Sequence, residues 1–191
     1  MATMAVAVPD KIIRWHYLWY VAIALAVMIA SIASDNRWFL NFTHVMSGVL
    51  WTGIDLFMGF IVGPVLRMAP PPARREIIIR LVPRTLFLMP TLAAITGTTG
   101  WYLAKYLGYF DLPWPQFGWV AAALTLLGLM TVQGTGILLP TNLWVCFQMR
   151  KERPDFEKIG RVMRMFFYLV AFQGIMQVAI IVIMARFVTG I

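Results

Sequence analysis

The sequence predicts an all-α fold, a polytopic bundle of five transmembrane helices that forms one integral membrane domain over residues 1–191. Composition and repeated apolar runs both lead to this prediction. Hydrophobic residues make up 61% of the chain and charged residues 13%, whereas a soluble domain carries about 25% charged residues. The apolar runs reach about 20 residues, which is enough for a helix to cross a hydrocarbon core of ~30 Å.

The five predicted spans follow one another along the whole chain. They cover about residues 13–34, 38–66, 86–107, 117–147 and 163–187. The first span follows Lys11 and Arg14 directly and lacks a clear small-residue cleavage site. It is also too long for the apolar part of a cleaved signal peptide, so we expect it to be retained. No separate soluble domain, low-complexity tract or internal repeat is evident in the sequence.

The basic residues predict the direction of the spans. If the N-terminus is cytoplasmic, Arg37, Lys105 and Arg186 lie outside and the other thirteen of the sixteen Lys and Arg residues lie inside. A Lys/Arg excess in short loops marks the cytoplasmic side. We therefore expect an N-in, C-out protein of the cell inner (plasma) membrane. The net charge of +8 then reflects topology, and we expect no nucleic-acid partner.

The connecting segments and the prolines carry further expectations. The inner segment "RMAPPPARREIIIRLVPR", residues 67–84, is expected to place a short amphipathic helix on the cytoplasmic leaflet. The outer segment "YLGYFDLPWPQFGW", residues 106–119, is aromatic-rich, as expected at a membrane interface. Pro64, Pro90 and Pro140 lie within or near the ends of three spans. Each removes a backbone hydrogen bond, so we expect each to kink its helix.

The second span contains the stretch "NFTHVMSGVLWTGIDLF", residues 41–57. At helical periodicity His44, Ser47, Trp51 and Asp55 share one face. His44 and Asp55 differ by only about 20° in direction but lie ~16 Å apart along the axis. They are therefore two sites on one face, or the two ends of one cavity, and they cannot touch. The same span ends in "GFIVG", the small-xxx-small pattern that lets two helices approach closely.

Asp55 is predicted to lie near the bilayer centre. An ionised carboxylate at that depth costs several kcal/mol in lipid, so it must face the bundle interior, be protonated or have a partner. Polar residues of three other spans lie at similar depth, and we expect them to form a polar belt around Asp55: Thr96, Thr98, Thr99, Thr131, Gln133, Thr135, Gln173 and Gln177. The belt could be a proton, ion or quinone-headgroup site, or it could simply hold the helices together.

His44 lies in the outer half of its span and has two interpretations. It can be a buried neutral histidine bonded to a threonine or a carbonyl, or it can be a metal ligand that binds a haem or copper. His16 lies at the opposite membrane face, so a haem held by two histidines of one chain is disfavoured. A second ligand would come from a methionine such as Met28 or Met184, from water or from another chain. The single Cys146 excludes a multi-cysteine metal site.

The stretch "HVMSGVLWTGIDLFMGFIVGPVLR" reads H-x6-W-x-G, followed by a basic residue at the inner end of the helix. It resembles a signature of small bacterial membrane proteins: the copper-resistance D (CopD) type, the membrane domain of some urate oxidases and the HemJ type. The resemblance covers about 25 residues. It implies that His44 is the ligand of a b-type haem or of copper, with Trp51 and Gly53 shaping the pocket. The sequence departs from that group at Asp55, where a small or apolar residue is usual.

Three functions follow from these observations. The first is a haem-b-binding membrane protein, acting in electron transfer or as a subunit of a respiratory or oxidase complex. In it His44 is the axial ligand, Arg37 or Lys105 pairs with the haem propionates and Asp55 moves a proton. The second is a copper or proton-coupled transporter that uses the midplane Asp55. The third is a structural membrane subunit. The expected partners are the lipid bilayer and other membrane subunits or further copies of the chain.

Overall fold

The computed structural model describes residues 15–149, 151 and 154–189. Every regular element among these residues is a helix. The elements, in chain order, are α1 (Tyr17–Ala33), α2 (Arg37–Phe57), a π-helical turn (Met58–Val62), α3 (Gly63–Met68), α4 (Pro71–Tyr106), a 3₁₀ turn (Tyr109–Asp111), α5 (Phe117–Gln133), a second π-helical turn (Gly134–Leu138), α6 (Leu139–Met149) and α7 (Phe156–Thr189).

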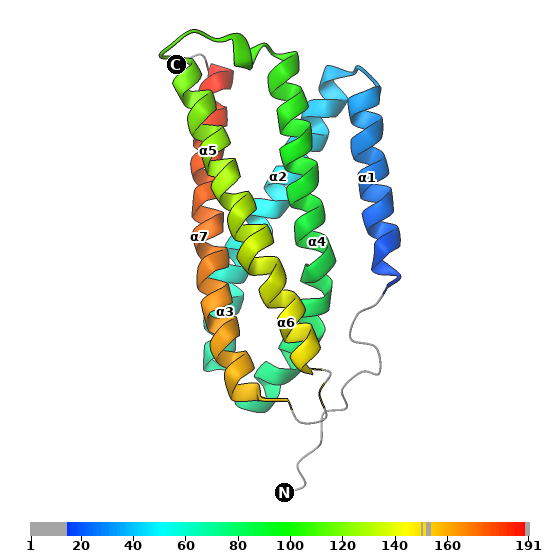
Figure 1. Cartoon of the computed structure of the whole chain (residues 1–191), viewed down its shortest axis with the longest axis vertical. Coiled ribbons are helices and arrows are strands. Elements are labelled where there is room, and N and C mark those ends of the chain that lie inside the picture. Colours follow the sequence, from blue (N-terminus) through cyan, green and yellow to red (C-terminus); the bar gives the residue numbers. More distant parts are fainter. Residues whose placement is uncertain (1–14, 150, 152–153, 190–191) are drawn as a thin grey trace, which may run out of the picture.

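These elements form five rods that alternate in direction (Figure 1). Four of them, Arg37–Met68, Pro71–Tyr106, Phe117–Met149 and Phe156–Phe187, are long and apolar enough to cross a membrane, and the described part of the fifth, α1, has 17 residues. The predicted all-α polytopic bundle is therefore confirmed. We call the end near the α3–α4 turn the inner end and the opposite end the outer end. That the inner end is cytoplasmic stays a prediction from the charges.

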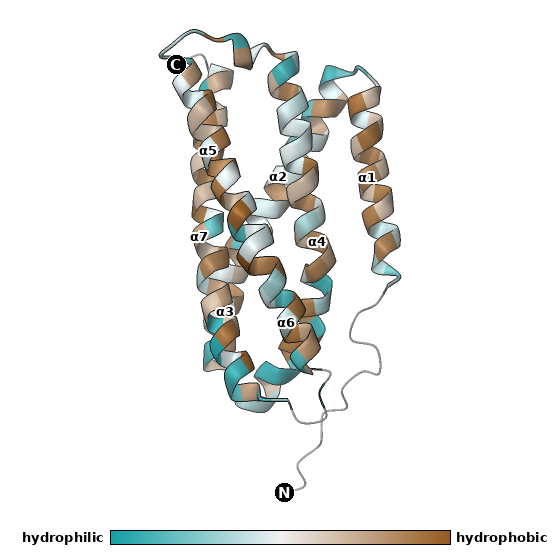
Figure 2. Cartoon of the chain, viewed as in Figure 1, coloured by the Kyte–Doolittle hydropathy of each residue, from teal (hydrophilic) through white to brown (hydrophobic). Residues whose placement is uncertain are grey.

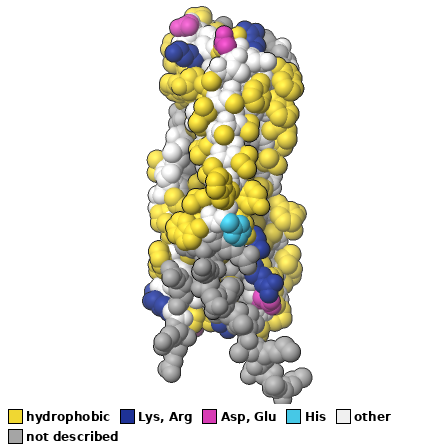
Figure 3. Space-filling view, turned by 90° about the vertical axis from the view of Figure 1, so that its right-hand side faces the viewer, with side chains coloured by type: hydrophobic (Ala, Val, Ile, Leu, Met, Phe, Trp, Pro, Cys, Tyr) yellow, Lys and Arg dark blue, Asp and Glu magenta, His cyan; other side chains and the backbone are white. Residues whose placement is uncertain are grey.

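The distribution of side chains agrees with a membrane-spanning bundle. Hydrophobic residues cover the middle of the rods and hydrophilic ones concentrate towards the two ends (Figure 2). On the face shown in Figure 3, Lys and Arg likewise lie towards the ends, with hydrophobic side chains between them. Many large apolar side chains point outwards, such as Ile23, Val49 and Val182. A lipid environment accommodates such an exposed apolar surface, whereas water does not.

The inner segment 67–84 differs from its prediction. No separate surface helix forms there, because α4 runs without a break from Pro71 to Tyr106. Pro71 and Pro72 occupy the first helical turn, where a missing N–H costs nothing. Ile79 and Val82 in the following turns are buried in the main apolar core. The same core holds Ile159, so α7 also begins earlier than predicted, at Phe156. Burial of these side chains extends the bundle beyond the predicted spans.

Two of the three prolines coincide with irregular helix geometry. The π-helical turns end shortly before Pro64 and before Pro140. In each turn a backbone N–H donates a hydrogen bond to the carbonyl oxygen five residues earlier, from Gly63 to Met58 and from Leu139 to Gly134. A proline cannot donate the usual bond to the residue four positions earlier, and a π-helical turn rearranges the bonds next to it. Pro90 lies inside α4 without such a turn.

The predicted small-xxx-small contact joins the second span to α7. A Cβ atom added to Gly59 would lie 2.5 Å from the Cα of Ala171, which is backbone, and one added to Gly63 would lie 2.9 Å from the Cβ of Phe167. On the α7 side, a Cβ on Gly174 would lie 2.8 Å from Cδ2 of Leu56. At Gly59 the neighbouring atoms are backbone, so only glycine permits the close approach of the two rods at this position. This approach brings the face of α2 that carries Asp55 against α7.

Candidate functional site

Asp55 lies at the centre of a buried cluster of glutamines. Its side chain is 2% exposed, and its Oδ2 accepts hydrogen bonds of 3.0 Å from Nε2 of Gln173 and from Nε2 of Gln177. Gln133 on α5 extends the cluster, because its Nε2 donates to the backbone oxygen of Leu169 at 2.8 Å and lies 3.5 Å from Oε1 of Gln173. Among the described residues no Lys or Arg forms an ion pair with Asp55. The carboxyl group therefore receives hydrogen bonds from two amide groups in place of a basic partner.

The sequence explains why these groups meet. Gln173 and Gln177 are four residues apart on α7, so they lie on one face one turn above the other. Gly174 lies between them and lets α2 approach. Trp51, one turn before Asp55, is buried with Met176 in a small apolar cluster that also contains Leu92 and Met130. This apolar cluster lies on the outer side of the Asp55 carboxyl group, towards the outer end of the bundle.

One atom of this cluster is unsatisfied. Oε1 of Gln177 is buried without a hydrogen-bond donor among the described residues. A buried acceptor in this state costs about 1–3 kcal/mol unless a donor reaches it. Rotation of the Gln177 amide by half a turn would exchange its oxygen and nitrogen. The amide can thus donate to a carboxylate or accept from a carboxylic acid, and the cluster suits both protonation states of Asp55.

The predicted polar belt is divided in the structure. Gln133, Gln173 and Gln177 join Asp55 as expected, whereas Thr131 and Thr135 are exposed and donate to carbonyl oxygens of their own helix. Their inclusion in the belt was wrong. Their side chains point out of the bundle, where a bond to the preceding turn satisfies the hydroxyl group.

Thr96 and Thr99 belong to a second cluster, which surrounds His44 between α2 and α4. Nδ1 of His44 lies 3.0 Å from the backbone oxygen of Thr96 and 3.5 Å from Oγ1 of Thr99. The Thr96 hydroxyl donates to Oγ of Ser47 at 2.9 Å. Because a carbonyl oxygen only accepts, Nδ1 carries a hydrogen atom in this arrangement. Nε2 has no hydrogen-bond partner among the described residues, so its lone pair is available in the neutral ring.

Gly100 on α4 makes room for the His44 ring. A Cβ atom at position 100 would lie 2.7 Å from Cε1 of His44, a distance that side chains do not tolerate. The contribution of Gly100, like that of the Thr96 carbonyl, escaped the sequence reasoning. The small-residue run "TGTTG", residues 96–100, is the signal that could have revealed it, because such runs mark close helix contacts.

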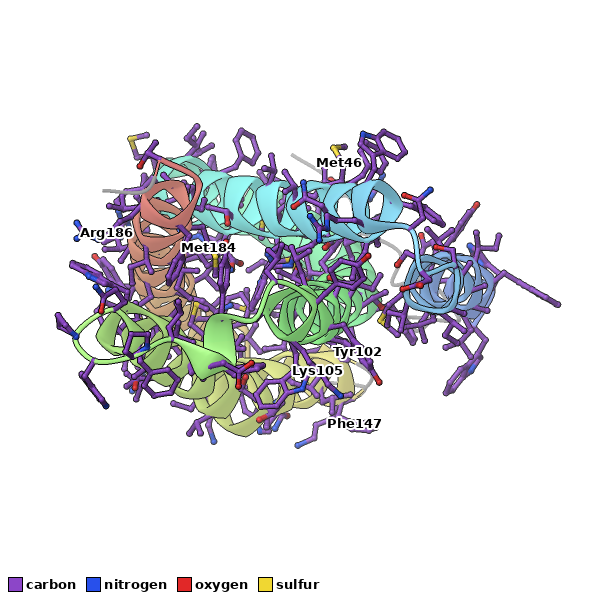
Figure 4. The ribbon with its side chains drawn as sticks, turned by 90° about the horizontal axis from the view of Figure 1, so that it is seen from above. Met46, Tyr102, Lys105, Phe147, Met184 and Arg186 are labelled. Atoms are coloured by element: carbon purple, nitrogen blue, oxygen red, sulfur yellow. The ribbon has the colours of Figure 1, made fainter. Side chains whose placement is uncertain are left out.

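The other predicted site residues do not all lie near His44. Trp51 lies with the Asp55 cluster rather than at His44. Gly53 is exposed, and an added Cβ would meet nothing within 4 Å. Arg37, at the start of α2, stacks over the Tyr106 ring with its Cζ 4.8 Å from the centroid. Lys105 projects from the side of α4 that faces away from α2 (Figure 4). The structure therefore brings Arg37, but not Lys105 or Gly53, to the interface of α2 and α4.

The proposed methionine ligands lie on separate sides of the bundle. Met28 is on α1, which packs against α4 and α2, whereas Met184 extends from α7 on the opposite side of the bundle (Figure 4). No group of three or more His, Cys, Asp or Glu side chains that could hold a metal ion occurs in the described part of the chain.

The fold and the two clusters define the class, a polytopic helical membrane protein with two separate polar sites on one inward face of its second span. His44 and Asp55 remain ~16 Å apart along α2. Comparison with models of known protein families, with curated proteins and with solved structures finds no match to this chain.

Proposed function

We propose that the protein is a haem-b-binding subunit of the bacterial inner membrane that acts in electron transfer, with His44 as axial ligand. The observation that carries this proposal is the contact between Nδ1 of His44 and the backbone oxygen of Thr96. Histidines that bind metals usually donate their second ring N–H to a carbonyl or carboxylate, which fixes the ring and directs the other nitrogen to the metal. Haem would supply a one-electron redox centre.

One neighbouring residue, Arg37, supports this proposal. Arg37 lies seven residues before His44, so both side chains share a face of α2, about 10 Å apart along the axis. Its guanidinium group suits a haem propionate, because arginine binds carboxylates with two parallel hydrogen bonds. We assign no such role to Lys105, which lies on another side of α4. Any further ligand that the described residues do not supply would come from water or from another chain, as expected from the sequence.

The first prediction tests this ligand. We expect detergent-purified protein to show the Soret band of a b-type haem, His44→Ala to lose at least nine-tenths of it, and His16→Ala to keep it. Difference spectra and metal analysis on the same samples measure this. A colourless wild type, or a band that survives His44→Ala, would contradict the proposal. If the wild type contains copper but shows no Soret band, and His44→Ala loses the copper, the result would instead support the copper alternative.

A second candidate function is proton-coupled transport through Asp55, and the unsatisfied oxygen of Gln177 favours it. A proton carrier must be stable both with and without its proton. Asp55 can receive two amide N–H groups when charged. When neutral, it can donate its own O–H to Oε1 of a rotated Gln177. Intramembrane carboxyl groups commonly mark proton pathways. A merely structural cluster would need no such alternative bonding.

The second prediction separates these roles. Asp55→Asn keeps the shape and the acceptor oxygen but cannot exchange a proton. We expect liposomes with this variant to lose most of their protein-dependent proton flux, while its melting temperature stays within a few degrees of wild type. Thr131→Ala, which removes an exposed hydroxyl, serves as control and should keep full flux. Equal flux in Asp55→Asn and wild type would exclude Asp55 as a carrier.

A further inference from the structure

A small cavity lies at the inner end of the bundle, between α4, α6 and α7. Its volume is about 50 Å³, several times the roughly 10–15 Å³ that a single water needs. Eight residues line it: Pro71, Arg74, Arg75, Ile78, Met149, Phe156, Ile159 and Gly160. Its wall is thus apolar apart from two arginines, and it plays no part in the sites around His44 and Asp55.

The first arginine is held in place by backbone oxygens of α3 and of the turn that follows it. Nε of Arg74 donates to the backbone oxygen of Leu66 at 2.8 Å, and its Nη2 donates to those of Arg67 at 3.0 Å and Ala69 at 3.2 Å. Its remaining nitrogen, Nη1, lies 3.9 Å from the position that a Cβ on Gly160 would occupy. Arg74 therefore presents a fixed positive group across the cavity towards α7.

The second arginine has an unfilled donor. The Arg75 guanidinium group lies over the Phe156 ring, with its Cζ 4.1 Å from the ring centroid. Contact with the ring therefore restricts the position of the guanidinium group. Nε of Arg75 is buried and has no hydrogen-bond acceptor among the described residues. A buried charged donor without an acceptor is unfavourable. An anion in the cavity would supply the acceptor that this nitrogen lacks.

The nearby acidic side chains of the described chain are bound elsewhere. Glu76 pairs with Arg80, and Glu157 pairs with Arg161 at 3.2 Å. Oδ1 of Asp155 accepts from the backbone N–H of Lys158 at 2.9 Å, at the start of α7. None of these three carboxylates lines the cavity. These three carboxylates therefore do not neutralise the positive charge of Arg74 and Arg75.

We propose that this cavity binds a phosphate group, with Arg74 and Arg75 as its ligands. A guanidinium group can bind two phosphate oxygens through two parallel hydrogen bonds. A site of this kind at the end of a membrane-spanning bundle suits the headgroup of an anionic phospholipid, and free phosphate shares the same chemistry. The proposal does not depend on haem or proton transfer.

The test compares two variants that each remove one charge from α4. Arg75→Gln removes the arginine with the unfilled donor, and Arg80→Gln removes an exposed arginine paired with Glu76. The full chain in neutral detergent is titrated with inorganic phosphate, with short-chain phosphatidylglycerol and with short-chain phosphatidylcholine, followed by thermal shift and native mass spectrometry. We expect phosphatidylglycerol to bind at least ten times more tightly than phosphatidylcholine. We expect Arg75→Gln to weaken that binding tenfold and Arg80→Gln less than threefold.

A cavity-filling variant, Gly160→Val, leaves both arginines in place and should also abolish binding. It keeps the test valid if Arg75→Gln does not fold. Binding of both inorganic phosphate and the anionic lipid would support a site for the phosphate group itself, and binding of the lipid alone would support a headgroup site. If neither inorganic phosphate nor phosphatidylglycerol binds, or if Arg75→Gln and Arg80→Gln weaken binding equally, the proposal is overturned.

Discussion

Gly59→Leu is expected to separate α7 from the second span and to destabilise the whole bundle. A Cβ at position 59 would meet the Cα of Ala171 at 2.5 Å and its backbone nitrogen at 2.7 Å. Because the obstacle is backbone, no side-chain rotation can relieve it, and the two rods must move apart. Overpacking usually costs about 1–3 kcal/mol. We expect at least ~3 kcal/mol here, since the larger leucine side chain would also disturb the packing around Gly63.

The melting temperature in detergent measures this effect, with Gly128→Leu as control. Gly128 lies on α5, and an added Cβ there would meet nothing within 4 Å. The control makes the same change of residue type in a helix interior, and we expect it to melt within a few degrees of wild type. Equal melting of the two variants would show that the contact between Gly59 and α7 does not hold the bundle together.

Gln173→Leu is expected to have the second largest effect on stability. It removes one of the two amide donors to Oδ2 of Asp55 and leaves Nε2 of Gln133 without Oε1 of Gln173. A buried polar group left without its partner costs about 1–3 kcal/mol. Here the carboxyl group loses a donor inside an apolar enclosure, so we expect a loss of ~2 kcal/mol or more. Leucine is an apolar side chain of similar size to glutamine, so the loss of stability would come mainly from the lost hydrogen bonds.

Chemical or thermal unfolding in detergent compares Gln173→Leu with Thr131→Ala. The control loses a hydroxyl that is exposed and bonded within its own helix, so its unfolding free energy should change by less than about 0.5 kcal/mol. Equal stability of the two variants would mean that the Asp55 cluster contributes nothing to the fold. That outcome would also bear on function. An Asp55 cluster that does not stabilise the fold could serve ligand or proton binding alone.

The inner ends of α4 and α7 show how sequence reasoning reached its limit. Charges and prolines in residues 67–84 lowered the local hydropathy, and the predicted third span therefore began at residue 86. The helix in fact begins at Pro71, and Ile79 is buried against residues from other rods. Average hydropathy measures how well a segment dissolves in lipid. It cannot detect an apolar face that is buried by protein beyond the predicted spans.

The polar residues show the same limit within the membrane. Depth along a span follows from counting residues, so Gln133 and Thr131 were both predicted to lie near Asp55. Gln133 faces inward and Thr131 faces outward. Two residues of separation turn a helix by about 200°, so depth alone cannot assign a partner. The rotation of each helix about its own axis decides which of its polar groups enter the bundle.

The sequence by itself determined that the chain is an all-α, membrane-spanning protein and that His44, Ser47, Trp51 and Asp55 share one face of one helix. These properties depend on composition and on the period of a single helix, which are local. Only the tertiary structure decided that Asp55 meets two glutamines of α7 and that His44 meets the Thr96 carbonyl and Gly100 of α4. Such contacts depend on how neighbouring helices are rotated and offset, which the period of a single helix does not determine.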